Sequence, residues 1–502
     1  MNGFILLPIF LPVITGTGLL ASLVGKGKRG KQEPAEEELR KLHFLVGMVL
    51  VISAAVALVM AWSGEKQLTL FYLMKDIPVY FHIDGVGALF VTITSIVWVA
   101  AGFYSFVYMK HEGKEQQFFG FYLIVYGVLV ALNFSGNLVT LYLFYELMSL
   151  TSMPLVLHSQ TRESIMAALK YLFYSMCGAY CGLFGIFFLY KYCDTLNFVE
   201  GGSLNLLLAQ ENQGILLLAV FLMIIGFGVK AGMLPMHAWL PAAHPVAPSP
   251  ASAVLSGIIV KAGVLAILRV VYYVVRPEFI RGTWVQTTWM TLTLLTVFMG
   301  SLLAFREKVF KKRLAYSTVS QASYILFGLS VLSQAGFTGA LLHTVFHAFI
   351  KCTLFLTAGI FIFKCHKTRV EELNGIGKQM PKTLWCYTFA SLALIGIPPT
   401  SVFVSKWYLA QGALEANVGV FGWLGPVVLL ISALLTAGYL LPITIKGFFP
   451  GSDADAAALS VNMEPSRGML IPLAVFAALS VLLGLLPNPL ISFAGQIAAG
   501  VL

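Results

Sequence analysis

The chain has 502 residues, of which 58% are hydrophobic and 11% charged, with a formal net charge of +10. A soluble globular protein usually carries about twice that charged fraction. Apolar runs of about 18 or more residues recur from one end to the other, which excludes a soluble fold and predicts an all-α polytopic membrane protein. The basic residues lie in short loops between these runs, as orientation signals do, so we exclude nucleic-acid binding.

The apolar runs predict about fourteen membrane spans. Polar segments near 25–42, 64–83, 192–213 and 448–467 are interpreted as connections. The predicted spans cover residues 4–24, 43–63, 84–109, 118–134, 138–157, 165–190, 214–238, 250–274, 284–304, 314–331, 336–363, 383–410, 422–447 and 468–488.

Basic residues concentrate in the odd-numbered loops. Because cytoplasmic loops of inner-membrane proteins are enriched in Lys and Arg, we expect the odd loops in the cytoplasm and both termini outside. The residues are Lys26, Lys28, Arg29, Lys31, Arg40 and Lys41 in loop one, Arg306, Lys308, Lys311, Lys312 and Arg313 in loop nine, and Lys364, Lys367, Arg369, Lys378 and Lys382 in loop eleven.

Two of the predicted spans are interrupted by proline. The stretch 223–269 holds two lysines, Lys230 and Lys261, beside prolines at 235, 241, 245, 248 and 250. Near the other end, Pro398 and Pro399 precede Lys406. Broken helices survive in hydrocarbon only where protein or water satisfies the freed backbone groups, and paired breaks in two halves are typical of transport sites at an internal repeat.

Several other ionisable residues fall inside predicted spans, where each charge costs about 2.5–3.5 kcal/mol on insertion scales. Glu146 is mid-span, and Lys170 lies one or two turns inside its span as a candidate partner for Glu146 or Lys230. His244 flanks the first break and is a candidate gate. Asp84 begins a span, where a carboxylate favours the helix N-terminus without any further role.

His343, His347 and Lys351 follow one another at intervals of four residues, so they share one helical face. A metal site at the two histidines is the alternative, but no third ligand is nearby in the sequence. A buried lysine exchanges its proton readily, and a histidine can accept on one ring nitrogen while donating from the other. These residues therefore predict a proton path along the membrane midplane, with waters bridging the gaps.

Five stretches in order resemble one family: FYELMSLTSMPLV, KAGMLPMHAWLPAAHPVAPSPASAVLSGIIVKAGV, KRLAYSTVSQASYILFG, HTVFHAFIKCTLFL and GIPPTSVFVSKW. The family is that of antiporter-like proton-translocating membrane subunits. It includes subunits L, M and N of NADH-quinone oxidoreductase (complex I), Mrp-type cation/proton antiporter subunits, and membrane subunits of membrane-bound hydrogenases.

The resemblance implies fourteen helices with two inverted five-helix repeats, each containing a discontinuous helix. It divides the chain into spans 1–3 (1–117), a first repeat (118–275), a second repeat (284–449) and a C-terminal span with its tail (450–502). The implied proton path runs through Glu146, Lys170, Lys230, His244, Lys261, His343, His347, Lys351 and Lys406.

We therefore predict a proton-translocating, or proton/sodium-translocating, subunit of a multi-subunit respiratory-type complex in the inner (plasma) membrane. The chain itself is expected to hold no cofactor, with iron–sulfur, flavin or nickel–iron centres in partner subunits, among them further antiporter-like subunits. An Mrp-type sodium/proton antiporter subunit is the alternative, and a secondary carrier for an organic solute is a remote one.

Overall fold

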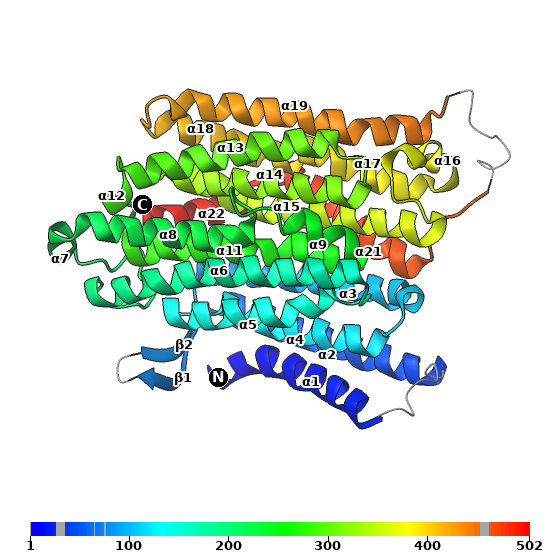
Figure 1. Ribbon diagram of the computed structural model, residues 1–502, viewed down its shortest axis with the longest axis horizontal. Coiled ribbons are helices and arrows are strands. Elements are labelled where there is room, and N and C mark those ends of the chain that lie inside the picture. Colours follow the sequence, from blue (N-terminus) through cyan, green and yellow to red (C-terminus); the bar gives the residue numbers. More distant parts are fainter. Residues whose placement is uncertain (1, 27–35, 65, 75–76, 452–460) are drawn as a thin grey trace.

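The computed structural model describes residues 2–26, 36–64, 66–74, 77–451 and 461–502, and 81% of the protein is helical. Long helices run side by side along the longest axis of the molecule (Figure 1). The predicted loop-one residues Lys28, Arg29 and Lys31 lie outside the described residues.

The described part of the first half of the chain forms a short 3-10 turn, a hairpin and nine helices up to the end of the first break. They are η1 (Asn2–Leu6), α1 (Leu7–Lys26), α2 (Glu36–Trp62), β1 (Lys66–Met74), β2 (Ile77–Ile83), α3 (Gly85–Glu112), α4 (Glu115–Asn133), α5 (Leu138–Val156), α6 (Arg162–Tyr192), α7 (Leu206–Glu211), α8 (Gln213–Ala231) and α9 (Leu240–Val246).

The next span, Ser249–Val275, is a composite helix. Regular turns α10 (Ser249–Val254) and α11 (Val260–Leu268) alternate with two π-helical segments, η3 (Leu255–Ile259) and η4 (Arg269–Val275). Because π-helical turns shift the hydrogen-bond register of a helix, they commonly accompany functional sites.

The second half repeats the pattern of long helices and one break. Its elements are α12 (Pro277–Ile280), α13 (Trp284–Arg306), α14 (Phe310–Ser330), α15 (Gln334–Cys365), η5 (Val370–Leu373), α16 (Ile376–Gln379), α17 (Pro381–Ile395), α18 (Ser401–Glu415), α19 (Phe421–Phe448), α21 (Arg467–Leu485) and α22 (Asn488–Val501).

Twelve helices in the described part of the chain are long and apolar enough to cross a membrane. The two remaining predicted spans correspond to α14, whose middle is rich in hydroxyl groups, and to α17 with α18, which are separated by the second break. A polytopic helical membrane protein is therefore confirmed, whereas the count of fourteen stays a prediction.

The segment 64–83 was predicted as a plain connection, and that prediction is wrong in part. Residues Lys66–Met74 and Ile77–Ile83 pair as an antiparallel hairpin. The second strand, IPVYFHI, alternates buried and half-buried side chains, which is the period-two pattern of a strand with one covered face. The fold is therefore mostly helical rather than all-α.

The loops sort into the two ends of the bundle. At one end, loops nine and eleven meet through a β-bridge between Val309 and Arg369 and an ion pair between Lys308 and Glu371, at 3.0 Å. At the other end, the hairpin meets Ser135, and Asn137 meets Asn197. The chain termini both lie toward this second end (Figure 1). Loops nine and eleven therefore lie at one end, and the hairpin with residues 135–137 at the other, while the assignment of these ends to the two sides of a membrane stays a prediction.

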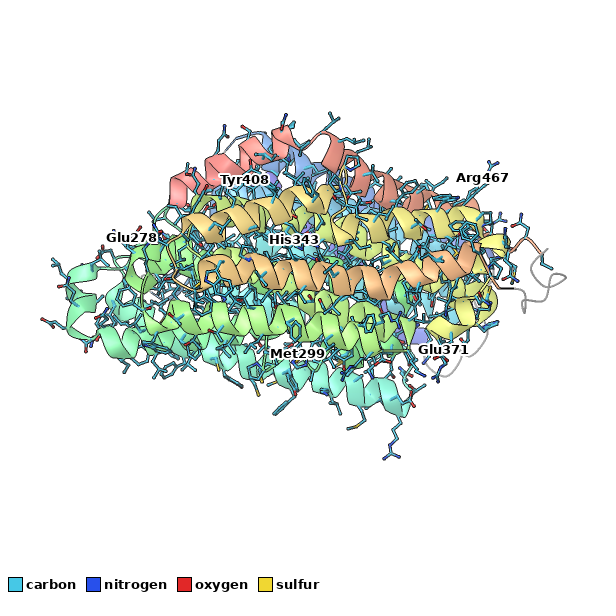
Figure 2. The ribbon with its side chains drawn as sticks, turned by 90° about the horizontal axis from the view of Figure 1, so that it is seen from above. Glu278, Met299, His343, Glu371, Tyr408 and Arg467 are labelled. Carbon is cyan, nitrogen blue, oxygen red and sulfur yellow. The ribbon has the colours of Figure 1, made fainter. Side chains whose placement is uncertain are left out.

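The centre of the bundle is formed by the span Ser249–Val275 and by α15. The most apolar window of the first is 100% buried inside the protein and that of the second 94%. Lipid therefore touches almost none of either helix, and polar side chains on them face protein. His343 of α15 lies about midway between Glu278 at one end and Glu371 at the other (Figure 2).

Candidate functional site

The first break begins where α8 ends at Gly232, whose φ of 75° is the left-handed conformation that glycine adopts most easily. The predicted span 214–238 is therefore shorter, and the chain turns before Pro235 rather than at residue 238. Freed backbone groups find partners: the Trp239 indole donates to the Val229 carbonyl at 2.8 Å, and the Leu234 N–H donates to Thr296 Oγ1 at 3.0 Å. This is how a broken helix is tolerated at membrane depth.

Lys230 is fully buried just before this break. Its ammonium donates to three hydroxyls, those of Ser149 at 2.8 Å, Tyr171 at 2.9 Å and Ser175 at 2.9 Å. An ammonium has three donors, so all of them are used, and the carboxylate of Glu146 is not among the acceptors. Glu146 and Lys230 are therefore not hydrogen-bonded to each other in this conformation.

Glu146 itself lies half-buried in the middle of α5, one turn before Ser149. Its Oε1 atom is buried and has no hydrogen-bond partner among the described residues. Lys170, the predicted partner, is half-buried on α6, with its ammonium 5.9 Å from the centroid of the Tyr174 ring of the same helix. The carboxylate is thus placed at mid-span without a direct counter-ion contact to Lys230.

Lys261 connects the two helices that form the bundle centre. Its ammonium lies 2.7 Å from the Ser256 carbonyl, inside the π-helical segment η3, and 2.6 Å from Nδ1 of His347. Ser256 lies five residues before Lys261. In this π-helical segment the Val260 N–H bonds the Leu255 carbonyl, so the Ser256 carbonyl is left available for the Lys261 ammonium. The Ser256 hydroxyl continues the contact to Thr318 Oγ1, at 2.7 Å.

His343 and His347 stack on one face of α15, with ring centroids 6.0 Å apart. His343 Nδ1 lies 3.0 Å from Ser405 Oγ on α18, and its ring stacks on Tyr324 at 5.4 Å. In both histidines Nε2 is buried and has no hydrogen-bond partner in the described part of the chain. The predicted common face therefore exists, and each ring keeps one nitrogen free for a water or a proton.

Lys406 lies at the second break, as predicted. Its ammonium donates to the Leu394 and Ile395 carbonyls, at 3.2 and 2.8 Å, and lies 5.2 Å from the centroid of the Tyr324 ring. These carbonyls end α17, where the helix dipole favours a cation. Since Tyr324 also stacks on His343, one ring separates the last histidine from this lysine.

Lys351 and His244 lie toward the end where loops nine and eleven meet. The Lys351 ammonium donates to the Leu314 carbonyl at 3.1 Å and to Ser317 Oγ at 2.7 Å. The His244 ring stacks on Phe355 at 4.6 Å, and neither of its nitrogens has a hydrogen-bond partner within the ranges that the structure describes. Both residues are fully buried.

Two buried charges escaped the sequence analysis. Lys311 was counted as a loop residue, but it is buried at the start of α14 and donates to the Ala247 carbonyl. Arg269 forms a bidentate ion pair with Asp84, in which Nη1 donates to Oδ2 at 2.5 Å and Nη2 donates to Oδ1 at 2.6 Å. Asp84 does cap its helix as predicted, by accepting from the Gly87 N–H at 2.8 Å, but it has this second partner. A charge within an apolar run was the available signal for Arg269.

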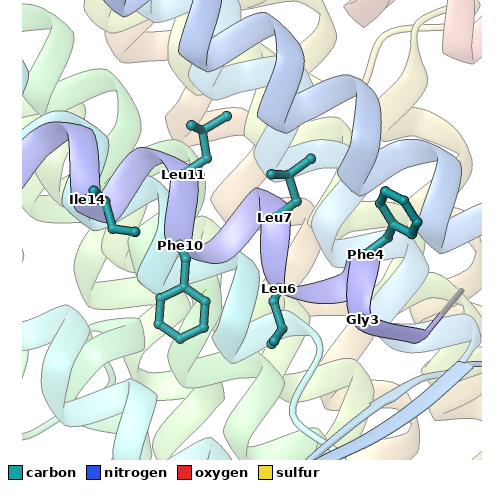
Figure 3. A pocket seen from close by; sticks show the side chains of 7 residues that line it. All are labelled: Gly3, Phe4, Leu6, Leu7, Phe10, Leu11 and Ile14. Atoms are coloured by element: carbon teal, nitrogen blue, oxygen red, sulfur yellow. The ribbon is translucent and has the colours of Figure 1, made fainter.

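One open pocket in the described part of the chain does not belong to this site. It measures about 570 Å³ and lies along η1 and α1, where its lining from Gly3 to Ile14 is apolar (Figure 3). Its lining residues carry no ionisable side chain, and none of the candidate residues of the proton path is among them.

The family described as "NADH:quinone oxidoreductase/Mrp antiporter, TM" matches residues 135–436, which is more than half of the chain and contains every candidate residue of the predicted path. The chain belongs to this family. It is an antiporter-like membrane subunit, and the resemblance read from the five sequence stretches is confirmed.

Relatives of this antiporter-like protein come from several kinds of complex. It is 30% identical to NADH-quinone oxidoreductase subunit N of Desulforudis audaxviator, over 89% of this chain and 91% of that protein. It is 31% identical to hydrogenase-4 component B of Escherichia coli, over 80% of this chain but 62% of that longer protein. It is 26% identical to the D-type subunit of the Na(+)/H(+) antiporter of Alkalihalophilus pseudofirmus, over 100% and 98% of the two chains.

Solved structures show the same fold. A chain of the membrane-bound sulfane sulfur reductase, an archaeal respiratory membrane complex, superposes with a TM-score of 0.83 at 23% identity, over 100% of both chains. A chain of the Mrp complex from Dietzia superposes with a TM-score of 0.82 at 21% identity, over 100% of this chain and 98% of that one. The NADH-quinone oxidoreductase and antiporter relatives are named as subunits, and the hydrogenase-4 relative as a component. The two solved structures are named as complexes.

Proposed function

We propose that this subunit conducts protons across the membrane through a chain of buried side chains that runs from the first helix break to the second. The main support for this proposal is the contact between Lys261 and His347. The Nζ atom of Lys261 and the Nδ1 atom of His347 lie 2.6 Å apart in the fully buried centre of the bundle. A protonated lysine can donate to a neutral imidazole, and a neutral lysine can accept from an imidazolium, but two protonated groups would repel. One mobile proton between two nitrogens is what a relay needs.

The steps on either side follow from the neighbouring contacts. Lys230, held by three hydroxyls, would supply Lys261 from the first break. His343 would take the proton from His347 along α15 and pass it toward Lys406 at the second break, past Tyr324. Where successive groups are beyond hydrogen-bond reach, waters would complete the path. The free Nε2 atoms of both histidines support this arrangement.

Glu146 and Lys170 are proposed as the group that loads the path. A half-exposed carboxylate in the middle of a span would be costly in lipid. We infer that a partner subunit covers the faces of α5 and α6 near Glu146, and that a further antiporter-like subunit is the occupant. Movement of Glu146 toward Lys230 would then strengthen the hold of Lys230 on its proton, and movement away would weaken it.

The wider assignment is a subunit of a respiratory-type complex in the inner membrane, with fourteen spans, two inverted repeats and the termini outside. The redox centres of such a complex would lie in partner chains. Relatives named as an NADH-quinone oxidoreductase subunit, a hydrogenase component and a Na(+)/H(+) antiporter subunit are all similar to this chain. The proposal therefore includes sodium as a second cargo, with an Mrp-type assembly as the alternative. Mass spectrometry of co-purified subunits separates the two, because the respiratory assembly should bring iron–sulfur proteins with it.

The test is proton flux through the purified assembly. The tagged full-length chain, with the subunits that accompany it, is reconstituted into liposomes, and a potassium/valinomycin potential drives proton flux that internal pyranine reports. Lys261→Met should lower the flux by about tenfold or more, because the relay loses its central carrier. The matched control is Lys110→Met, which removes an exposed lysine at the end of α3 and should leave the flux unchanged. Unchanged flux in both Lys261→Met and Glu146→Gln would disprove the proposal.

A further inference from the structure

Lys311 is a buried lysine that the proposed path does not use. It is the second residue of α14, its side chain is about 5% exposed, and its ammonium donates to the carbonyl of Ala247 at the end of α9. A buried lysine usually needs a reason beyond stability, because its charge must be taken out of water.

Three ionisable groups meet where α9, α14 and α15 come together. His244 lies three residues before Ala247, and its ring stacks on Phe355, one turn after Lys351. Lys351 in turn contacts the carbonyl of Leu314, one turn after Lys311. Lys311 and Lys351 are also the two cations that act electrostatically on His244.

His244 is the unsatisfied member of this junction. It is fully buried, and neither Nδ1 nor Nε2 has a hydrogen-bond partner among the residues that the structure describes. Buried polar groups in folded proteins are nearly always paired, so two free nitrogens on one ring point to ligands that come and go, such as water or a proton.

The junction also leads outward. Glu112, the exposed last residue of α3, is the anion that acts electrostatically on Lys311. One turn before it, the hydroxyl of Tyr108 lies 3.3 Å from Ser249 Oγ, at the start of α10. An exposed carboxylate near a buried lysine is an arrangement that collects protons at a surface and offers them inward.

We propose that Lys311 and His244 form a separate proton-uptake branch that feeds Lys351 from the end of the bundle where loops nine and eleven meet. In this branch the Lys311 ammonium leaves the Ala247 carbonyl and gives a proton to one ring nitrogen of His244. The other ring nitrogen releases its proton to neutral Lys351, and Lys311 regains one from water beside Glu112. The branch rests on the proposed function, because its proton is useful only if Lys351 and His347 conduct it onward.

A purely structural role makes a different prediction. Lys311 could serve only as a fixed cation at the end of α9, where it satisfies a carbonyl and the helix dipole. Arginine can keep that contact and that charge but does not release a proton in proteins. Histidine can release a proton. Lys311→Arg and Lys311→His therefore distinguish a lysine that transfers a proton from one that only holds a positive charge at the end of α9.

The experiment uses the same reconstituted assembly and the same pyranine readout. Lys311→Met and Lys311→Arg should both lower the flux to about half, because the route through Lys230 still supplies Lys261, whereas Lys311→His should keep most of the flux. The control is Lys312→Met, which removes the adjacent, partly exposed lysine that binds Glu307 at 2.9 Å, and it should behave as the unmodified protein. The amount of each variant that co-purifies with its partner subunits shows whether the variant assembles. If Lys311→Met does not assemble, the flux of Lys311→Arg tests the proposal.

Wild-type flux in Lys311→Arg would overturn the branch, and so would an equal loss in Lys312→Met, which would indicate a general effect of surface charge. The outcome for the main path is read independently from Lys261→Met. If that variant loses flux while Lys311→Arg does not, only the uptake branch fails. If Lys261→Met keeps its flux, the proposed function fails first.

Discussion

The ammonium of Lys261 and Nδ1 of His347 lie 2.6 Å apart, although 86 residues separate them along the chain. Three features bring them together. The π-helical segment before Lys261 turns the lysine toward α15, the carbonyl of Ser256 holds its ammonium, and the composite helix that carries it is completely enclosed by protein. The contact is therefore built into the centre of the fold and does not depend on a flexible surface side chain.

This contact predicts that Lys261 and His347 act as one unit. His347→Gln should lower proton flux by about tenfold or more, because an amide cannot carry a proton between Lys261 and His343. Adding Lys261→Met to His347→Gln should cause little further loss, since residues that serve the same step are not additive. Flux in reconstituted liposomes for the two single variants and the double variant measures this coupling.

The control for this prediction lies just after the end of the same helix. His366 follows the last residue of α15 and is exposed, so His366→Gln changes the same residue type outside the buried centre. It should leave the flux unchanged. If the losses of Lys261→Met and His347→Gln instead multiplied in the double variant, the two residues would serve different steps and a shared proton would be excluded.

The buried charges were predictable because an apolar span makes them conspicuous. A lysine or histidine in hydrocarbon is costly, so His343 and His347 stand out at once, and their spacing of four residues is enough to place them on one face. The structure agrees, with ring centroids 6.0 Å apart. The two breaks were equally visible, because proline removes a backbone donor wherever it occurs.

The partners of these charges were not predictable. Lys230 contacts Ser149, Tyr171 and Ser175, which come from two other helices and are 55 to 81 residues away. Serine and tyrosine are common in membrane helices, so nothing in their local sequence marks them as ligands. Lys230 contacts these hydroxyls rather than Glu146 because of the way α5, α6 and α8 pack against one another. That packing cannot be read from a single sequence.

Two further differences between the predicted and the observed structure concern the start of α14 and the hairpin at 66–83. Lys311 was assigned to a loop because the predicted span began at residue 314, whereas α14 begins at Phe310. Element boundaries read from sequence are uncertain by about two to four residues, and here one helical turn separates a loop charge from a buried group. The hairpin at 66–83 was missed because its alternation is short beside the long apolar runs that flank it.

Glu307, between α13 and α14, should make stability depend on pH. Partial burial alone would raise the pKa of Glu307, but N–H groups of Val309 and Lys308 and the Lys312 ammonium lower the pKa overall. A group with a lowered pKa contributes stability above its ordinary pKa of 4.5, and that contribution is lost as the pH falls below it.

Glu307→Gln should therefore lower the thermal unfolding midpoint in detergent at pH 7, and the difference from the unmodified protein should shrink as the pH drops below about 4.5. The size should be under about 1 kcal/mol, since the site is close to solvent. Glu278→Gln changes an exposed glutamate at the other end of the bundle and should show no such trend. A difference that grew toward low pH would contradict the predicted sign.

The Asp84–Arg269 pair should be a large contributor to stability once either partner is changed alone. Arg269 is almost fully buried, between the rings of Phe198 and Tyr273, so removing the charge of Asp84 leaves a guanidinium without its counter-ion. Breaking such a pair typically costs about 3–5 kcal/mol, whereas replacing both members costs far less. Asp84→Asn is the sharpest change, because the amide oxygen can still accept from the Gly87 N–H and only the charge is lost.

Thermal unfolding in detergent, followed by tryptophan fluorescence, should show a marked loss for Asp84→Asn and a partial recovery for Asp84→Asn combined with Arg269→Met. The matched control is Asp194→Asn, an exposed aspartate whose Oδ1 accepts from Asn205 at 3.1 Å, and it should change the midpoint little. If Asp84→Asn behaved like Asp194→Asn, the buried pair would be energetically neutral. A double variant less stable than Asp84→Asn would show that Arg269 stabilises the fold through its two aromatic neighbours rather than through the carboxylate, because only those contacts are removed at the second step.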